Sequence, residues 1–357
     1  MSKQLRERVL MKKLVLVVSL LTALGVIAGV VALRSETVAL TLIERALNAQ
    51  GTPPALPEET LTVVVCGSAS PLGTQPDRAQ ACIAVLTDQH FFVFDLGAGS
   101  AARLSQAQLP TSRLTAVFLT HLHSDHMADL PTVNLPRWAG GGASEPLMIF
   151  GPAGVDSVVS GFNEAYRIDR GFRVAHHGAD FMPPAGGTLS SQVIEPGVVW
   201  SDESLSITAF TVDHDPIAPA YGYRVDYGGR SVVISGDTVN TPVLWEAAAG
   251  ADLVFHDALA LPVLKVMSQA ALSAGQPRLA KIVTDVMDYH AELSGLQVSA
   301  DAAGVGRLVL YHLVPSPPNA LVKGFFDRAV TAPSLVAEDL MRFELPAGSK
   351  TVRVQEP

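Results

Sequence analysis

Four side chains of the kinds that bind metal ions stand within six positions of one another: His121, His123, Asp125 and His126. They follow residues 115–120, an apolar run whose β-branched and aromatic side chains predict a buried strand. Alternate residues of an extended chain point the same way, so His121 and His123 can converge on one cation. Asp125 and His126 lie beyond the turn and can face a second cation. Nitrogen and oxygen ligands of this kind suit zinc. The weaker interpretation is a polar turn whose histidines occur there by chance. The whole chain has only ten histidines, so three of them within six positions are unlikely to be accidental.

Similar residues follow short apolar runs elsewhere in the chain. In order, they are Asp95 in Asp-Leu-Gly, His214, Asp237 in Gly-Asp-Thr and His312 at the end of residues 307–312. With the His-x-His-x-Asp-His motif, this ordered set resembles the metallo-β-lactamase-fold hydrolases. Ala-Tyr-Gly-Tyr-Arg at residues 220–224 is similar to the ribonuclease Z and arylsulfatase branch of that family. The resemblance runs from about residue 61 to about residue 318.

The resemblance implies an α/β fold, a four-layer αββα sandwich with the metal ions at one edge. It implies two zinc ions, the first bound by His121, His123 and His214. The second would be bound by Asp125, His126 and His312, and Asp237 would bridge the two. Asp125 and His290 are the expected catalytic residues. His290 matches a histidine that lies near the leaving group in the ribonuclease Z branch, where it would donate a proton or stabilise charge.

A carboxylate shared by two cations has a clear chemical use. It lets them sit about 3.5 Å apart and hold a hydroxide between them, and the two charges lower the pKa of that water toward neutrality. The antibiotic-degrading members of the fold generally lack the bridging aspartate, so Asp237 disfavours β-lactam hydrolysis. His123 stands where iron-dependent members usually have glutamate, which favours zinc. A mononuclear iron oxidoreductase on the same fold remains an alternative.

His290 has a second interpretation, as part of a polar patch that caps a helix. The branch has His-Glu where this chain has His256-Asp257, and the shorter Asp257 could still orient His290. His176 and His177 lie in a region rich in glycine and proline, and they either line the substrate pocket or stand in a surface loop.

The strand and helix pattern must place all these residues at one edge. Apolar runs predict strands at residues 61–66, 82–87, 91–95, 115–119 and 147–150 in the first half. Further strands are predicted at 205–212, 221–226, 231–235, 252–256 and 308–311. Helical segments are expected at 127–138, 154–166, 242–249 and most of 258–287. Strands mixed with helices, with candidate ligands at strand ends, indicate sheets covered by helices.

Charge and spacing bear on the substrate. The formal net charge is −9, and the first thirteen residues contribute +4, which leaves −13 for the rest. Such an acidic domain lacks the basic surface that holds a polyanion. Only 22 residues separate His214 from Asp237, too few for the long arm of the transfer-RNA-processing members. We therefore expect no nucleic-acid partner, and a small ester substrate: a sulfate ester or phosphodiester, then a lactone. A ribonuclease Z-like nuclease is kept as an alternative.

The N-terminus predicts a membrane segment. Residues 14–33 carry no charge and follow Lys12-Lys13, so residues 1–34 are expected to be a transmembrane anchor or a signal segment. This would make the membrane a partner and place the rest outside the cytoplasm. Residues 35–57 are expected to form an amphipathic helix and a proline-rich linker, and residues 58–357 the hydrolase domain. Cys66 ends the first predicted strand, and Cys82 begins the second. The two cysteines either form a disulfide or remain buried thiols.

Overall fold

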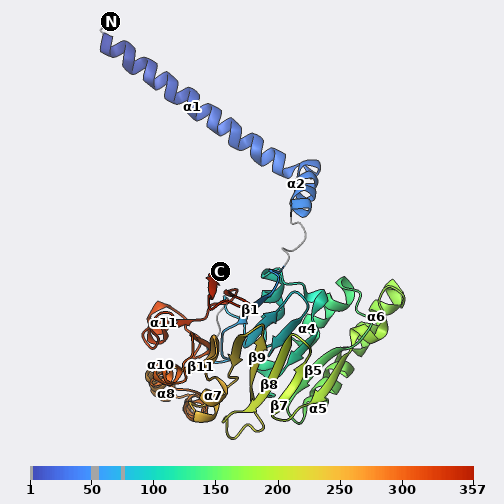
Figure 1. Cartoon of the computed structure of the whole chain (residues 1–357). Helices are drawn as coiled ribbons and strands as arrows, with labels where there is room; N and C mark the ends of the chain where they lie inside the picture. Colours follow the sequence, from blue (N-terminus) through green and yellow to red (C-terminus); the bar gives the residue numbers. More distant parts are fainter. Residues whose placement is uncertain (1–2, 50–55, 74–76) are drawn as a thin grey trace. The chain divides into compact units, whose positions relative to one another are not determined.

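Two β-sheets carry the residues singled out by the sequence. The computed structural model describes residues 3–49, 56–73 and 77–357. The first sheet has the strand order β15-β14-β1-β2-β3-β4-β5-β6 and the second β13-β12-β11-β10-β9-β8-β7 (Figure 1). The first consists of β1 Thr60–Gly67, β2 Cys82–Leu86, β3 Phe91–Phe94, β4 Ala116–Phe118, β5 Leu147–Gly151, β6 Leu189–Val193, β14 Arg342–Pro346 and β15 Arg353–Gln355. The second consists of β7 Gly197–Ser201, β8 Leu205–Thr211, β9 Tyr221–Tyr227, β10 Arg230–Ile234, β11 Leu253–Leu259, β12 Leu308–Val314 and β13 Leu335–Val336.

Three apolar clusters define the layers. The central cluster joins the facing sides of the two sheets, where Phe118 and Phe150 stack with ring centroids 4.7 Å apart and Tyr223 packs edge-on. A second cluster lies between the first sheet and its helices α3 Ser100–Gln106, α4 Leu130–Leu135 and α5 Val155–Ala165. A third lies between the second sheet and α7 Pro242–Ala247, α10 Leu296–Ala302 and α11 Ala320–Asp327. The predicted α/β class and its two sheets are confirmed.

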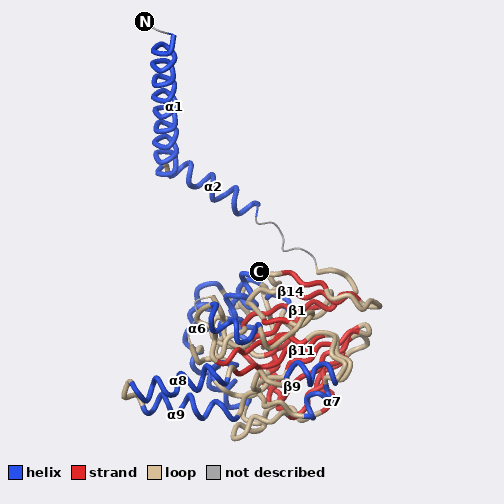
Figure 2. The backbone as a smooth tube through the Cα atoms, turned by 90° about the vertical axis from the view of Figure 1, so that its left-hand side faces the viewer, coloured by secondary structure: helices blue, strands red, loops and turns tan. Residues whose placement is uncertain are grey.

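The remaining helices lie outside these layers. A π-helical turn, Pro136–Gly140, continues α4, and α6 Arg167–His177 follows α5 directly. On the other sheet, α8 Leu261–Ser273 and α9 Pro277–Asp285 lie side by side (Figure 2) and enclose a small apolar cluster of their own. Short 3₁₀ turns occur at Thr111–Arg113, Ser124–His126, Pro184–Gly187 and Val286–Asp288.

Parallel strands bring the candidate ligands to one edge. β3, β4, β5 and β6 are parallel in the first sheet, and β10, β11, β12 and β13 are parallel in the second. Asp95 directly follows β3, and two residues separate His121 from β4 and Asp237 from β10, so these residues all stand just beyond carboxyl ends of strands. Side chains at such ends meet at the same edge of the sandwich.

The expectation that most of residues 258–287 are helical is confirmed, because α8 and α9 fill most of this segment after the end of β11. The sequence pattern was wrong elsewhere. Most of α6 falls in the region from residue 171 to 187, where loops were expected. The two cysteines form a disulfide, with their Cα atoms 4.9 Å apart.

The N-terminal residues form a separate unit. The chain divides into Met1–Pro54 and Ala55–Pro357, and the described part of the first unit consists of α1 Lys3–Arg34 and α2 Glu36–Ala49. The predicted membrane segment, residues 14–33, falls within α1. Across the described ranges 3–49, 56–73 and 77–357, however, no helix is both long and apolar enough to cross a bilayer. The anchor and the membrane as a partner are therefore unsupported. The boundaries expected at residues 34 and 57 stay a prediction.

Candidate metal centre

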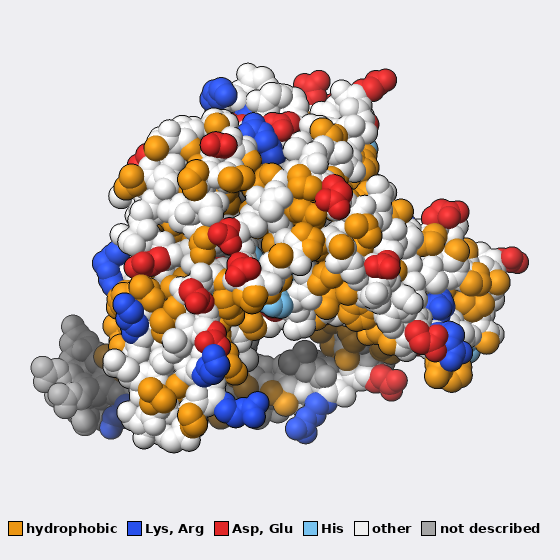
Figure 3. All heavy atoms as spheres, turned by 90° about the horizontal axis from the view of Figure 1, so that it is seen from below, with side chains coloured by type: hydrophobic (Ala, Val, Ile, Leu, Met, Phe, Trp, Pro, Cys, Tyr) orange, Lys and Arg blue, Asp and Glu red, His pale blue; other side chains and the backbone are white. Residues whose placement is uncertain are grey.

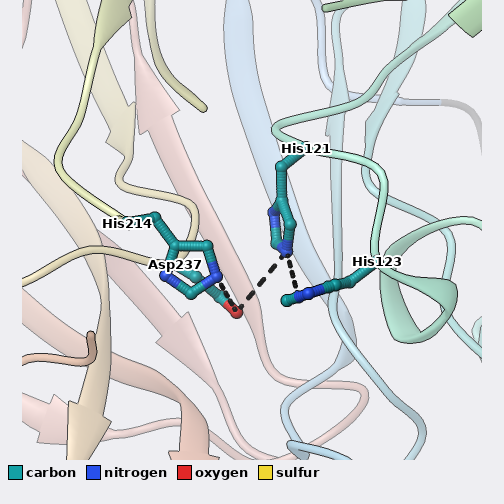
Figure 4. A group of neighbouring side chains, drawn as sticks. All are labelled: His121, His123, His214 and Asp237. Atoms are coloured by element: carbon teal, nitrogen blue, oxygen red, sulfur yellow. Dashed lines mark hydrogen bonds and ion pairs between the residues drawn. The ribbon is translucent and has the colours of Figure 1, made fainter. Parts of the chain in front are cut away.

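The seven expected metal ligands lie together at the edge of the sandwich. Their potential ligand atoms form overlapping groups in which every atom lies within 4.8 Å of the others. One group is His121, His123, His214 and Asp237, which converge from four separate positions in the chain (Figure 4). The next is Asp125, His126 and His312, and a third joins Asp237 with His290 and His312. Segments nearly two hundred residues apart in sequence thus contribute to one cluster.

Asp237 occupies the centre of the cluster. Its Oδ2 atom lies 3.3 Å from His126 Nε2 and 3.4 Å from His312 Nε2 on one side. On the other side it lies 3.8 Å from His121 Nε2 and 3.9 Å from His214 Nε2. The carboxylate is buried between two sets of imidazoles, which is the position that a carboxylate shared by two cations requires.

Local backbone geometry turns these side chains inward. Residues Ser124–His126 form a 3₁₀ turn, closed by a hydrogen bond from His126 N to His123 O, which directs Asp125 and His126 back toward His121. His312 is the extra residue of a bulge in β12, because Asp257 pairs with Tyr311 and Ala258 with Leu313. Its φ of 41° is unusual for a residue other than glycine. Bulges of this kind re-aim a side chain next to a functional site.

The polar atoms at the centre fit a bound cation. His126 Nε2, His214 Nε2 and Asp237 Oδ1 are buried and have no hydrogen-bond partner in the described part of the chain. The other nitrogen of each histidine is held: His214 Nδ1 lies 2.9 Å from Tyr289 O, and His126 Nδ1 lies 2.8 Å from Asp95 Oδ2. Buried polar atoms without partners are costly, and a cation between them would satisfy all three.

The charges of the cluster suit metal binding as well. Burial lowers the pKa of His121 well below its usual value and also lowers those of His123 and His214, so these three imidazoles are neutral and can donate lone pairs. Burial alone would raise the pKa of Asp237, but His312 and His126 outweigh it and hold the pKa well below the usual value.

His126 and His312 behave differently from the other histidines. Burial alone would lower their pKa values, but the carboxylates around them, Asp237 first, raise both. The same carboxylates that favour a proton on these rings would favour a cation in its place, so protonation and metal binding compete at this side of the cluster.

Asp95 orients the second group of ligands. Its carboxylate accepts hydrogen bonds from Thr120 N at 2.8 Å and from Thr120 Oγ1, as well as contacting His126 Nδ1. This arrangement keeps the proton of His126 on Nδ1 and leaves Nε2 facing Asp237. Thr120 and the carbonyl of Tyr289 were not identified from the sequence. A backbone contact such as that of Tyr289 leaves no signal in the residue types.

His290 lies beside the cluster and is held by Asp257. His290 Nδ1 lies 2.9 Å from Asp257 Oδ2 and 4.0 Å from Asp237 Oδ2. Burial alone would raise the pKa of Asp257, but hydrogen bonds with His256 and His290 outweigh it and lower the pKa. The shorter aspartate thus reaches His290, as the sequence suggested it could. The catalytic role of His290 stays a prediction.

A cavity opens onto these groups. It has a volume of about 200 Å³ and is lined by His123, Asp125, Asp237, His290 and His312 together with Leu72 and Tyr289. From below, a histidine is visible at the edge of a hollow in the molecular surface (Figure 3). His176 and His177 are exposed at the end of α6 and do not line this cavity.

The fold, the shared carboxylate and the histidine groups define a metal-dependent hydrolase. Residues 90–313 match the family model described as the Beta-lactamase superfamily domain. Ribonuclease Z from Mycobacterium marinum is 33% identical over 296 residues, which covers 80% of this chain and 99% of the relative. Ribonuclease Z from Mycobacterium avium is 35% identical over 298 residues, which covers 81% of this chain and all of the relative. The crystal structure of the metallo-β-lactamase-fold protein YhfI from Bacillus subtilis has the same fold, with a TM-score of 0.56 at 18% identity; the match covers 80% of this chain and 99% of YhfI.

The chain therefore belongs to the metallo-β-lactamase superfamily, in its ribonuclease Z-like branch. Members of the fold with such His and Asp clusters bind a divalent metal, commonly zinc. The prediction of a small ester substrate with no nucleic-acid partner is wrong, because relatives matched over 99–100% of their length are ribonucleases. Net charge misled the prediction because it describes the whole surface, whereas bound cations add local positive charge that a residue count omits.

Proposed function

We propose that this protein is a dinuclear zinc phosphodiesterase that cleaves RNA. The observation that carries the proposal is the buried Asp237 carboxylate between two sets of imidazoles, with the His290–Asp257 pair beside it. The relatives support RNA as the substrate class, because they are ribonucleases similar to this chain over almost their whole length.

The residues divide into two metal sites. His121, His123 and His214 would hold one zinc ion. Asp125, His126 and His312 would hold the other, and Asp237 would contact both. When bound, the two ions supply Lewis-acid polarisation of the phosphoryl oxygens and lower the pKa of water that attacks phosphorus. Asp125 shapes the site electrostatically: although burial alone would raise its pKa, His126 and His312 lower it, so its carboxylate stays ionised.

His290 would handle the leaving group. Nδ1 of its ring donates to the Asp257 carboxylate, which leaves Nε2 free to carry and deliver a proton. The ionised Asp257 stabilises the protonated ring and fixes its orientation. His256 in turn steadies Asp257, since His256 Nδ1 lies 3.1 Å from Asp257 Oδ1. We infer that the alkoxide oxygen released from phosphorus takes the proton of His290.

The test is RNA cleavage by the purified full chain. Labelled single-stranded and structured RNAs are incubated with zinc-loaded protein, with chelator-treated protein and with Asp237→Asn. Asp301→Asn is the matched control, because Asp301 is an exposed carboxylate on α10. We expect cleavage by the wild type and Asp301→Asn, and none by the other two preparations. Cleavage at the wild-type rate after complete metal removal would rule the proposal out.

We also propose that the protein works in an oxidising compartment outside the cytoplasm. The support is the disulfide between Cys66 and Cys82, both fully buried in the first sheet. Thiol labelling of protein that is unfolded without reductant directly from cells should find both cysteines blocked. Two labelled thiols would overturn the location.

A further inference from the structure

A second cavity lies in the helical layer that covers the first sheet. It has a volume of about 180 Å³ and lies between α4 with its π-helical turn and the α5–α6 pair. Its lining includes Trp138, Phe162, Tyr166, Arg170 and Arg173. None of these residues belongs to the metal cluster. The proposed chemistry does not use the cavity, and the packing of the two sheets does not account for it.

Aromatic side chains form much of its wall. Trp138 is only 3% exposed, and its indole N–H donates to Pro183 O at 2.7 Å, so the ring is fixed in place. Phe162 is half-buried, while Tyr166 is 43% exposed at the rim. Rigid aromatic faces that border an open cavity are the surfaces on which unpaired nucleobases stack.

Two arginines add positive charge to the same cavity. Within the described residues, the side chain of Arg170 makes only two long hydrogen bonds, from Nη1 and Nη2 to Asn163 O at 3.5 Å each. Arg173 Nε donates to Asp169 Oδ2 at 2.8 Å in an exposed pair, which leaves its terminal nitrogens available. Two arginines against one aspartate give the lining a net charge of +1. The planar guanidinium groups suit a phosphate or the edge of a base.

The position of α6 makes this wall available to a ligand. Tyr166, Arg170 and Arg173 stand at i, i+4 and i+7 around α6, so they share one side of the helical turn. None of the α6 residues is buried, and Phe172 is 70% exposed, so the sandwich core does not depend on this helix. Figure 1 shows α6 at the periphery, next to α5.

The cavity is also linked to the metal cluster through the chain. α4 begins at Leu130, four residues after His126, and Pro131 and Thr132 line the cavity. At the start of α5, a Cβ added to Gly154 would lie 3.1 Å from Leu122, which stands between two expected ligands. Two short stretches of chain thus connect residues of the metal cluster with helices that border the second cavity.

We propose that this cavity binds one nucleotide of the RNA substrate, with the base against Tyr166 and Phe162 and the phosphate at Arg170 and Arg173. The proposal rests on the proposed ribonuclease function. The site would recognise a single-stranded nucleotide, because a paired and stacked base cannot enter a pocket of this size.

The experiment compares KM for RNA among variants of the full zinc-loaded chain. The variants are Tyr166→Ala, Tyr166→Phe, Arg170→Gln and Arg170→Lys, and the matched control is Arg278→Gln, which removes an exposed arginine from α9. The probes are a single-stranded RNA and the same RNA with abasic positions. Crosslinking of 4-thiouridine RNA to the wild type, followed by peptide mapping, supplies a readout that does not depend on turnover.

We expect Tyr166→Ala and Arg170→Gln to raise KM for RNA about tenfold. A tenfold change is about the loss of affinity expected when one base-stacking contact is removed. Tyr166→Phe should restore the wild-type KM, because the ring and not the hydroxyl is used, and Arg170→Lys should restore it only in part. Crosslinks should fall in residues 155–177. Wild-type KM in all four variants, or crosslinks confined to other segments, would overturn the nucleotide site while leaving RNA cleavage intact. Absence of RNA cleavage by the wild type would instead remove the proposed function, and the site with it.

Discussion

Replacing Asp95 by asparagine should weaken metal binding while the fold stays intact. The carboxylate contacts Thr120 N at 2.8 Å, Thr120 Oγ1 at 2.9 Å and His126 Nδ1 at 2.8 Å. Asparagine has the same size and tolerates the φ of 57° found at this position. Its carbonyl can keep the bond from Thr120 N. Its amide, however, donates a proton where His126 needs an acceptor.

The expected size of the effect follows from that one contact. With an N–H aimed at Nδ1, the proton of His126 moves to Nε2, the atom that faces Asp237. Hydrogen bonds to charged groups are worth about 1.5–3 kcal/mol. Loss of the partner that orients a metal-bound histidine lowers metal affinity about 10- to 100-fold. That range corresponds to about 1.4–2.7 kcal/mol, so the two estimates agree.

The assay is zinc affinity by competition with a chromogenic chelator, with thermal unfolding as the check on folding. Asp129→Asn is the matched control, because Asp129 Oδ2 accepts a hydrogen bond from Ala101 N near the same turn and contacts no expected ligand. We expect a loss of zinc affinity for Asp95→Asn and wild-type affinity for Asp129→Asn. Equal affinity in Asp95→Asn and the wild type would refute the orienting role of Asp95.

Three other predictions concern separate parts of the chain. His290→Ala should lower kcat for RNA about 10²- to 10⁴-fold, the usual contribution of a positioned proton donor, while metal analysis finds the zinc content unchanged; zinc loss would assign His290 to metal binding instead. Replacing Cys66 and Cys82 by alanine opens a loop with a sequence separation of 16, and urea denaturation should show about 3 kcal/mol less stability; an unchanged unfolding midpoint would contradict this. The slight burial of Asp202 would raise its pKa, but N–H groups of Ser204 and Leu205, with His90, lower it to about 2. The ionised Asp202 carboxylate therefore contributes its full stabilisation at pH values above the ordinary pKa of 3.8, and this stabilisation is lost as the pH falls toward 2. NMR titration of the carboxyl group measures this pKa, and a midpoint near 3.8 would be inconsistent with those hydrogen bonds.

The convergence of His121 and His123 could be predicted from their residue types and positions, because they follow a buried strand at alternate positions. The expectation that Asp237 joins them came from the resemblance to the metallo-β-lactamase-fold hydrolases. The bulge at His312 could not be predicted, because it depends on how β12 pairs with β11 and not on its own residues. The contact of His214 with the Tyr289 carbonyl could not be predicted either, because a backbone oxygen leaves no signal in the residue types.

The predictions for α6 and for the substrate class were wrong. α6 contains Gly171 and four charged residues in eleven, and none of its residues is buried, so no core-facing apolar face identifies it; the i,i+4 pair of Asp169 with Arg173 supports the helix. Substrate class was mispredicted from net charge, although the binding of a polyanion depends on the few groups that touch it. The resemblance to ribonuclease Z in residues 220–224 and 236–238 was the better guide.

Anomalous diffraction at the zinc edge, from crystals of the zinc-loaded chain, tests the metal centre most directly. We expect two peaks, one among His121, His123 and His214 and the other among Asp125, His126 and His312, with the Asp237 carboxylate between them. A single peak, or two peaks that do not share Asp237, would contradict the dinuclear centre on which the proposed RNA cleavage depends.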